Sequence, residues 1–378
     1  MFITGDDRIG LTWHPSLAAS ILSHADHLDI VEVIPEGLFL DSRRARRGLR
    51  LLSREIPVAI HGVSLGLSSA EGITVRRLDA FARLVDEVAP EHWSEHLAFV
   101  RAGGIELGHL AAPSRTALSV EITAENLDQA TRRVGSCPLV ENVATLVDPP
   151  ASDRSEPAWL RALLDASPAD LLLDLNNLVT NGHNLGYDPL AAVDAIPAHR
   201  IRAVHVAGGT EVSATTGERR LLDDHRHAVP DVVYSLLARV GARVPHPIDV
   251  ILERDGAFPP FAQLLDEVDR ARAALAAGRA QRKTPADRML DVVRLRPDGR
   301  PAGWPSDEAR ARHARLEELL ARVYTDPRAR QEFRADPLGE GRRAGLDREF
   351  LDALGHADWP GLELAAASFA RKRRTRQD

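Results

Sequence analysis

Short apolar runs alternate with longer helical patterns over the first two thirds of the chain. Each run is rich in Leu or β-branched residues and is bounded by Pro, Gly or charged residues. Continuous apolar runs of this kind are typical of parallel strands that are buried on both faces. The eight runs are IGLTW (9–13), LDIVEVI (28–34), PVAIH (57–61), WSEHLAF (93–99), PLVENV (138–143), LLLDL (171–175), IRAVHVA (201–207) and IDVILE (248–253).

Amphipathic segments lie between these runs. Segment 76–88 places apolar residues three and four positions apart, as on one face of a helix. Asp188 and Pro189 predict another helix start, with Asp as N-cap and Pro in the first turn. A last helical pattern covers 259–275. The eight β/α units predict an α/β protein with a (β/α)8 TIM barrel. The alternative is an open doubly wound sheet, which the lack of a G-x-G-x-x-G motif after the first run disfavours.

A different pattern follows the barrel. We expect a TIM-barrel domain over 1–278, a linker over 279–305 and a small all-α C-terminal domain over 306–378 that ends in a basic tail. Ser306 is expected to cap a helix, and the Asp-Pro pairs at 326–327 and 336–337 to begin two more. Gly345 and Gly355 are expected to end helices. The predicted core of this domain consists of Leu316, Leu319, Leu320, Val323, Phe333, Leu346, Phe350, Leu351, Leu354, Trp359 and Leu362.

The composition excludes several classes of protein. The 378 residues are 44% hydrophobic and 27% charged, which is enough for one barrel and a small domain. A net charge of -7 does not imply a broad nucleic-acid surface. Cys137 is the single cysteine, which excludes an internal disulfide and a metal cage of thiolates. No apolar stretch is long enough to span a membrane and the first residues lack a signal-peptide pattern, so we expect a cytoplasmic protein.

Polar residues that can bind metal ions lie at or just after the carboxyl ends of these runs. In a TIM barrel the strand ends and the loops after them form one mouth, so residues far apart in the sequence meet there. Imidazole together with carboxylate suits iron, manganese or zinc. The residues are His61, His96, Glu141, Asp174, Asn177, His205, Asp223, His225 and Glu253.

Each of these residues, taken singly, has an ordinary explanation. A lone His in a strand is more often a core residue with hydrogen-bond partners than a ligand. Glu141 or Glu253 can pair with a barrel Arg, Asn177 can cap a helix, and the polar loop 207–228 can be solvated. Several of the residues nevertheless stand inside apolar runs, where an unpaired charge is costly. The joint pattern therefore favours a site for more than one metal ion.

The same residues fall within motifs that occur in a fixed order from 8 to 275. The motifs are IGLTW, IHGVSLGL, SEHLAF, VENV, DLNNLVTNGHNLGYDP, VHVAGG and ILERDG. In this order the chain resembles the multinuclear non-haem iron-dependent oxidative enzymes, which include the methanobactin-biosynthesis oxidase and modify ribosomally made peptides. The resemblance implies a xylose-isomerase-like barrel with a metal arrangement similar to that of the endonuclease-four type of barrel.

The resemblance also implies which residues bind metal. Glu141 is expected to bridge two ions. The endonuclease pattern has a His where this chain has Asn177, which argues against DNA repair, and His183 is the alternative ligand from the same loop. The other ligands that the resemblance implies are His61, His96, Asp174, His205, Asp223, His225 and Glu253.

Five further residues are expected to act beside the metal ions. Asp255 and His227 are expected as catalytic groups. Glu32 and Glu36, after the second run, are expected to line the mouth and bind substrate, together with Arg254.

The function that the resemblance implies is an oxidation that depends on iron and dioxygen. We expect two or three iron ions of mixed Fe(II)/Fe(III) state, with O2 as co-substrate. The expected substrate is a ribosomal precursor peptide, modified at Cys or another side chain near its C-terminus. Relatives commonly act with a separate peptide-recognition protein, which segment 306–378 is expected to replace here, unless it is a packing or dimerisation extension. Neither nucleic acid nor a membrane is an expected partner.

Two other classes of function stay open. The first is a divalent-metal sugar isomerase, or a phosphodiesterase or endonuclease, on the same barrel. The second is a non-catalytic protein that binds metal or peptide.

Overall fold

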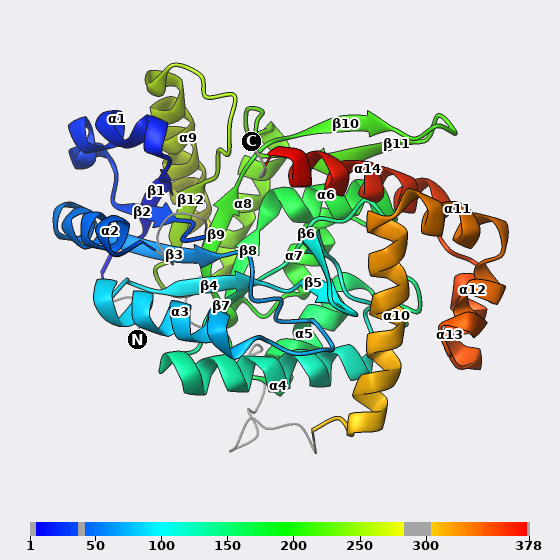
Figure 1. Cartoon of the computed structure of the whole chain (residues 1–378). Coiled ribbons are helices and arrows are strands. Elements are labelled where there is room, and N and C mark those ends of the chain that lie inside the picture. Colours follow the sequence, from blue (N-terminus) through cyan, green and yellow to red (C-terminus); the bar gives the residue numbers. More distant parts are fainter. Residues whose placement is uncertain (1–4, 37–41, 283–303, 376–378) are drawn as a thin grey trace.

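A closed barrel of parallel strands forms the centre of the molecule (Figure 1). The computed structural model describes residues 5–36, 42–282 and 304–375. The eight predicted runs are the eight barrel strands, so the TIM-barrel prediction is confirmed and the open doubly wound alternative is wrong. In barrel order, the strands are β1 (Arg8–Thr12), β12 (Asp249–Leu252), β9 (Ile201–Val206), β8 (Leu171–Asp174), β7 (Leu139–Glu141), β4 (Trp93–His96), β3 (Val58–Gly62) and β2 (Ile30–Val33).

Helices surround the barrel, and most of them follow a strand. The predicted helix at 76–88 is confirmed as α3. Asp188 caps α7 by accepting a hydrogen bond from the Leu190 amide at 3.0 Å, as expected. The helices are α1 (Ala18–Ser23), α2 (Arg43–Glu55), α3 (Val75–Val88), α4 (Ala117–Val134), α5 (Glu156–Ala166), α6 (Leu175–Leu185), α7 (Pro189–Ala195), α8 (Asp231–Arg243) and α9 (Phe261–Ala280), with 3-10 turns at Pro15–Leu17, Ala25–His27 and Ala198–Arg200.

Apolar residues cover both faces of the barrel strands. A large buried core lies between the strands and the helices, and smaller buried clusters fill the barrel interior, one of them formed by Ile30, Ala59 and Ile251. Because both faces are buried, a polar side chain on a strand must have a partner inside the protein. At the amino end of the barrel, Asp249 is such a residue, with hydrogen bonds from Arg8 at 2.7 Å and from His92 at 3.0 Å.

Two hairpins extend from the carboxyl end of the barrel, and neither was predicted. WSEHLAF was expected to be one strand, but β4 ends at His96. Phe99 begins β5 (Phe99–Ala102), which pairs antiparallel with β6 (Ile105–Ala111). The long polar loop at 207–228 contains the antiparallel pair β10 (Gly209–Ser213) and β11 (Arg219–Asp223). Both hairpins form walls around the mouth of the barrel.

The C-terminal segment is helical and begins with the predicted caps. Ser306 accepts a hydrogen bond from the Ala309 amide at 3.1 Å, and Asp326 and Asp336 cap the next two helices in the same way. Gly345 and Gly355 follow two of the helix ends. The helices are α10 (Asp307–Thr325), α11 (Pro327–Ala335), α12 (Pro337–Arg343), α13 (Arg348–Leu354) and α14 (Trp359–Thr375).

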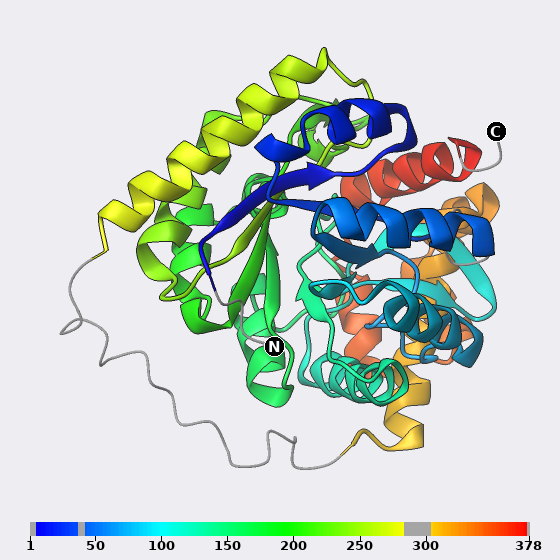
Figure 2. The ribbon, with the colours of Figure 1, turned by 90° about the vertical axis from the view of Figure 1, so that its left-hand side faces the viewer.

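The C-terminal helices share their core with the barrel's first hairpin. Of the residues predicted as a separate core, all are buried except Leu351 and Trp359, which are partly buried. The same cluster contains Phe99 and Leu107 of the β5–β6 hairpin. Helix α10 packs on α4, β5 and β6, and α14 packs on α10 and β6. Figures 1 and 2 show these helices, in orange and red, on the side of the barrel away from α9.

The boundaries of the expected linker differ in part from what the structure shows. Helix α9 continues through Ala280, so the first residues of the expected linker are helical. Residues 283–303 lie outside the described part of the chain. The basic residues Lys372, Arg373 and Arg374 form the last turn of α14, and 376–378 also lie outside it. Among the described helices, we find none with the length and apolar character needed to cross a membrane.

Candidate metal centre

The register of the barrel strands brings ligand-type side chains to one level at the carboxyl end. His96 is the register partner of Glu141 across β4 and β7, and Asp174 is that of His205 across β8 and β9. Because neighbours in register point to the same face of a sheet, each pair lies side by side. Glu253 directly follows β12, whose last residue is in register with Val206 just after His205. The strands therefore gather these residues into one cluster.

The ligand atoms of this cluster are about as far apart as atoms bound to one ion. Glu141 Oε2 lies 3.1 Å from His61 Nε2 and 3.1 Å from His96 Nε2. Glu141 Oε1 lies 3.3 Å from His205 Nδ1, which is 3.0 Å from Glu253 Oε2. Atoms that sit about 2.1 Å from a common ion at right angles are about 3.0 Å apart. The two oxygens of Glu141 thus face two groups of ligands, as a bridging carboxylate does.

Three imidazoles are oriented by a partner on the ring nitrogen that faces away from the cluster. His61 Nδ1 lies 2.8 Å from Ser94 Oγ, and His96 Nδ1 donates to the Gly62 carbonyl oxygen at 3.0 Å. His205 Nε2 lies 3.1 Å from Glu32 Oε2. Ligand imidazoles in metal sites almost always have such a partner, which fixes the tautomer and the ring orientation. The nitrogen that remains on each ring is directed into the cluster.

Several buried polar atoms in the cluster lack hydrogen-bond partners. Such atoms show whether the residues fit a metal ion. His205 Nδ1 and Glu253 Oε2, for example, lie 3.0 Å apart without forming a hydrogen bond. An unpaired buried polar atom is costly, and a cation between such atoms removes the cost. The atoms are Glu141 Oε2, Asp174 Oδ2, Asn177 Oδ1, His205 Nδ1, His225 Nε2 and Glu253 Oε2. The residues therefore fit a multinuclear metal site.

The electrostatics of the imidazoles depends on the carboxylates around them. Burial lowers the pKa of His61 well below its usual value, so its ring is neutral. Burial acts in the same direction on His96 and His205, but it is outweighed there. Glu141 raises the pKa of His96 to about 9, and Glu253 is the strongest of the carboxylates that raise the pKa of His205 well above its usual value. Protons and metal ions compete for the same nitrogens in such a site.

The β10–β11 hairpin contributes the remaining expected ligands. Asp223 Oδ1 lies 2.8 Å from His225 Nε2 and accepts a hydrogen bond from Asn176 Nδ2 at 2.6 Å. His225 has a left-handed backbone with φ of 52°, and its Nδ1 lies 3.4 Å from Glu253 and 3.6 Å from Asp255. The hairpin thus brings this pair to the edge of the central cluster.

Asn177 and His183, the two alternatives from α6, lie in different places. Asp174 caps α6 by accepting a hydrogen bond from the Asn177 amide at 2.7 Å. Asn177 Nδ2 donates to the Asn142 carbonyl oxygen at 3.0 Å, which leaves its Oδ1 free on the cavity side. His183 lies farther along α6 and is exposed. The structure therefore brings Asn177, and not His183, to the cluster.

Glu32 and Glu36 are not at the mouth, where the sequence placed them. Glu32 is completely buried and lies 3.0 Å from His205 Nε2, so it contacts the ring of His205 and does not reach the cavity. Glu36 accepts a hydrogen bond from the Val63 amide at 2.7 Å, and burial next to Glu95 raises its pKa to about 7. Glu32 points inward because the second strand is buried on both faces, and Glu36 follows that strand without lining the cavity.

Arg254 and His227 also lie outside the cluster. Arg254 is buried and pairs with Glu267 of α9 at 2.6 Å, so its side chain points away from the cavity that Glu253 and Asp255 line. His227 is half exposed and pairs with Asp224 at 2.9 Å. Only Asp255, of the two expected catalytic residues, lines the cavity.

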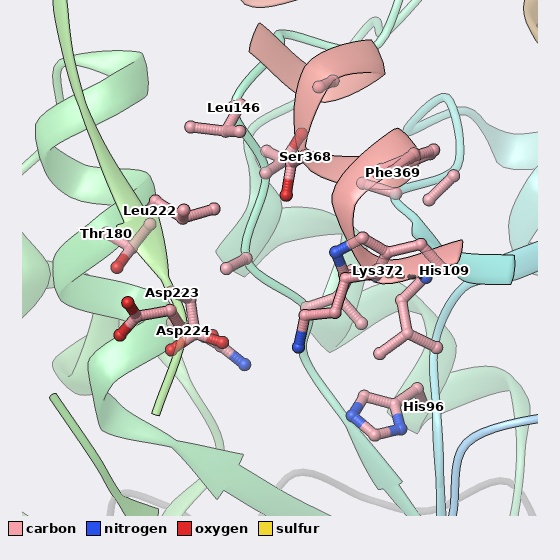
Figure 3. Close-up of a pocket in the computed structure, with 18 of the residues that line it drawn as sticks. His96, His109, Leu146, Thr180, Leu222, Asp223, Asp224, Ser368, Phe369 and Lys372 are labelled. Carbon is pink, nitrogen blue, oxygen red and sulfur yellow. Dashed lines mark hydrogen bonds between the residues drawn. The ribbon is translucent and has the colours of Figure 1, made fainter. Parts of the chain in front are cut away.

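A cavity of about 210 Å³ lies above the cluster, and the sequence motifs do not predict most of its walls. His61, His96, Asn177, Asp223, His225, Glu253 and Asp255 form its polar side. The hairpins, the loop after β7 and the C-terminal helices form the rest. Figure 3 shows Phe369, Ser368 and Lys372 of α14 over the cavity, with His96 on one side and Asp223 and Asp224 on the other. The wall residues that were not predicted include His109, Leu146, Leu222, Asp224, Tyr324, Ser368, Phe369 and Lys372.

Glu95 is a further residue whose position was not predicted. It is completely buried, and its carboxylate accepts hydrogen bonds from the amides of Leu65 and His96, both at 2.9 Å. It thereby fixes the loop after β3 next to His61.

Comparison with known proteins gives one family and several relatives. The family described as RiPP precursor modification enzyme MbnB/TglH/ChrH matches residues 8–276. A UPF0276 protein of Streptomyces avermitilis is 35% identical over 273 residues, which are 70% of this chain and 54% of that protein. A UPF0276 protein of Rhizorhabdus wittichii is 34% identical over 247 residues, which are 65% of this chain and 86% of that protein. The chain thus spans about half the length of the Streptomyces relative. Among solved structures, a xylose isomerase domain protein from Planctomyces limnophilus is 16% identical with a TM-score of 0.49, covering 73% of this chain and 99% of its own.

Proposed function

This chain belongs to the family of RiPP precursor modification enzymes MbnB/TglH/ChrH, and we propose that it oxidises a side chain of a precursor peptide with iron and dioxygen. The family expected from the sequence motifs is therefore confirmed. The proposal of an iron-dependent oxidation rests on one observation. Buried nitrogen and oxygen atoms without hydrogen-bond partners converge below a cavity. A site that only stabilised the fold would have no use for such a cavity above it.

Two positions in the cluster have enough ligands to hold a metal ion. His61, His96 and Glu141 surround the first, and Glu141, Asp174, His205 and Glu253 surround the second. Asp223 and His225 lie beside the second and offer a third position. The donors are imidazole and carboxylate without thiolate, which iron accepts. We infer that iron, as in the resemblance drawn from the sequence, is the metal.

Bound iron would supply the redox chemistry, in which the peptide side chain loses electrons and dioxygen accepts them. The protein's own residues hold and orient the reactants. Glu32 and Ser94 fix the rings of His205 and His61, which keeps the ligand set rigid when substrate enters. Asp255 lies at the cavity wall, 3.6 Å from His225 Nδ1, and is the candidate proton acceptor for the substrate.

The C-terminal helices are part of the proposed substrate site. Tyr324 of α10 and Phe369 of α14 line the same cavity as His61 and His96. We infer that this segment does some of the work that a separate peptide-recognition protein does for relatives. The peptide would then lie between the metal centre and α14.

Co-expression tests the proposal. The full chain is produced with a short peptide encoded beside its gene, and the peptide is analysed by mass spectrometry. We expect a mass change that depends on air and on iron and that disappears in Glu141→Ala. The control is the same peptide expressed with Gly48→Ala, a change at an exposed position of α2 that is not among the cavity-lining residues.

The outcome also separates the alternative functions. Zinc, manganese or magnesium as the sole metal, with no uptake of dioxygen, would favour an isomerase or phosphodiesterase and reject the oxidase. Full metal loading with no change in any neighbouring peptide would favour a binding protein.

A further inference from the structure

The last helix of the chain forms part of the cavity wall. Ser368, Phe369 and Lys372 are spaced as on one face of α14, and all three line the cavity that holds His96 (Figure 3). This face is therefore in position to contact whatever the cavity binds. Helix α14 lies outside residues 8–276, which are the part of the chain that matches the family.

Close backbone contacts hold α14 in place. A Cβ atom on Gly361 would lie 2.5 Å from the Leu146 carbonyl oxygen, so the start of the helix rests directly on the loop after β7. At the other end, Arg373 Nη1 donates to the Leu107 carbonyl oxygen at 3.0 Å. A Cβ atom on Gly108 would meet the stem of the same Arg373 side chain at 2.7 Å. Both ends of α14 are thus fitted to the barrel's loops.

Aromatic packing fixes the middle of the helix. The Phe369 ring lies 4.7 Å from the His109 ring and 5.1 Å from the Tyr324 ring, measured between centroids. Aromatic contacts of this kind contribute beyond their buried area. The position of the next turn, which carries Lys372, is therefore set by the core.

Lys372 is the one Lys or Arg side chain among the described residues that line the cavity. Its ammonium group points into the cavity, above His96 and across from Asp224 (Figure 3). The structure gives it no hydrogen bond or ion pair with the described residues, although the chain forms many Arg–carboxylate pairs elsewhere. The sequence contains only one other lysine, Lys283.

We propose that Lys372 binds a carboxylate group of the peptide substrate and thereby selects where along the peptide the reaction occurs. This inference rests on the proposed function, because it takes the substrate to be a peptide. A peptide offers a carboxylate at its C-terminus or on an Asp or Glu side chain. An ammonium group with three free donors binds either, and the apolar walls around it, such as Leu146 and Phe369, strengthen the attraction.

Ligand-observed NMR on the full-length, zinc-loaded protein tests the inference without turnover. Zinc accepts the same nitrogen and oxygen ligands and is not redox-active. The probes are N-acetyl tetraalanine as free acid, its C-terminal amide, and the amide with one Ala replaced by Asp. We expect one carboxylate peptide to bind about ten- to hundredfold more tightly than the neutral amide, as a charge-assisted hydrogen bond implies. The preferred probe tells which carboxylate is recognised.

Variants assign this preference to one residue. Lys372→Met removes the charge at similar length and should abolish the preference, and Lys372→Arg should restore much of it. Arg374→Met is the matched control, because it removes a charge two positions away on an exposed side chain and should keep the preference. Zinc content, measured by elemental analysis, should be equal in all of them.

Three outcomes would overturn the inference. They are equal affinity of the wild type for all probes, a carboxylate preference that survives in Lys372→Met, and loss of zinc in Lys372→Met, which would make the residue a support of the metal site. Failure of the oxidase proposal is distinguishable, because a protein that never alters a peptide can still show the preference.

Discussion

Glu141 belongs to two of the candidate metal positions, and His96 belongs to one. Replacing Glu141 by Ala takes a ligand from both positions. The first then keeps only His61 and His96, while the second keeps Asp174, His205 and Glu253. Replacing His96 by Ala leaves the second position complete. The structure therefore predicts different metal stoichiometries for the two variants.

The expected loss of metal follows from how much one ligand contributes to metal affinity. Loss of an outer hydrogen-bond partner costs ten- to hundredfold in metal affinity, so loss of a direct ligand is expected to cost at least about a hundredfold. When the free metal concentration is about ten times the wild-type Kd, occupancy of a position falls from about 90% to about 9% after a hundredfold loss. Glu141→Ala should then lose most of its metal, and His96→Ala should lose about one ion.

Elemental analysis of protein loaded with Fe(II) without air, in a metal buffer of known free concentration, measures these stoichiometries. Circular dichroism shows whether the barrel is folded, which we expect because the hydrophobic core does not involve either residue. His205→Ala takes a ligand from the second position and leaves the first complete, so it should lose about one ion, as His96→Ala should. Equal metal content in Glu141→Ala and the wild type, or complete loss in His96→Ala, would refute the assignment of Glu141 as the shared ligand.

Two further predictions concern the fold around the site. Hydrogen bonds from His92 and Arg8 outweigh the effect of burial and lower the pKa of Asp249. The ionised carboxylate therefore stabilises the folded protein at pH values above the pKa that Asp249 has in the unfolded chain. This stabilisation is lost as the pH falls through the lower pKa of the folded protein. Asp249→Asn should lower the free energy of unfolding by about 2 kcal/mol at neutral pH and should not change it at low pH. The value is below the range for fully buried pairs because Arg8 and His92 are partly exposed. Urea unfolding at several pH values measures the difference, and a difference that stayed constant with pH would contradict this prediction. Gly361→Ala should loosen α14, since its Cβ atom would meet backbone at 2.5 Å. The amides of α14 should exchange faster in Gly361→Ala than in the wild type, and should be unchanged in Gly48→Ala, where an added Cβ atom has no neighbour within 4 Å. Equal protection of α14 in both variants would show that the contact between Gly361 and the loop after β7 is unimportant.

The sequence allowed prediction of the barrel and of most residues of the candidate metal cluster. Strand ends in a TIM barrel converge whatever the sequence between them, so local evidence of a strand was enough to place residues such as His61 and His205. Glu32 shows how far this signal reaches. It stands inside the apolar run LDIVEVI, where an unpaired carboxylate is as costly as at Glu141. The same reasoning therefore predicts a buried partner for Glu32, and the structure identifies it as His205.

The walls of the cavity could not be predicted in this way. Arg254 follows Glu253 directly, yet it points into α9, because the direction of a side chain after a strand depends on the turn of the loop. The contribution of Phe369 and Lys372 depends on how α14 packs against a hairpin more than 250 positions earlier in the chain, as the contact of Arg373 with Leu107 shows. No periodicity within a segment contains this information.

The helical segment 306–378 is connected to the barrel in a way that limits what its deletion can show. Leu316 and Leu319 of α10 share a core with Phe99 and Leu107 of the β5–β6 hairpin. Deletion would expose that hairpin, which forms one wall of the cavity, so lost peptide binding would follow even if the segment never touched the peptide. Lys372→Met leaves this core intact and changes only a group that points into the cavity. A loss of carboxylate preference in that variant, with α14 still protected from hydrogen exchange, would therefore separate recognition of the substrate from support of the wall.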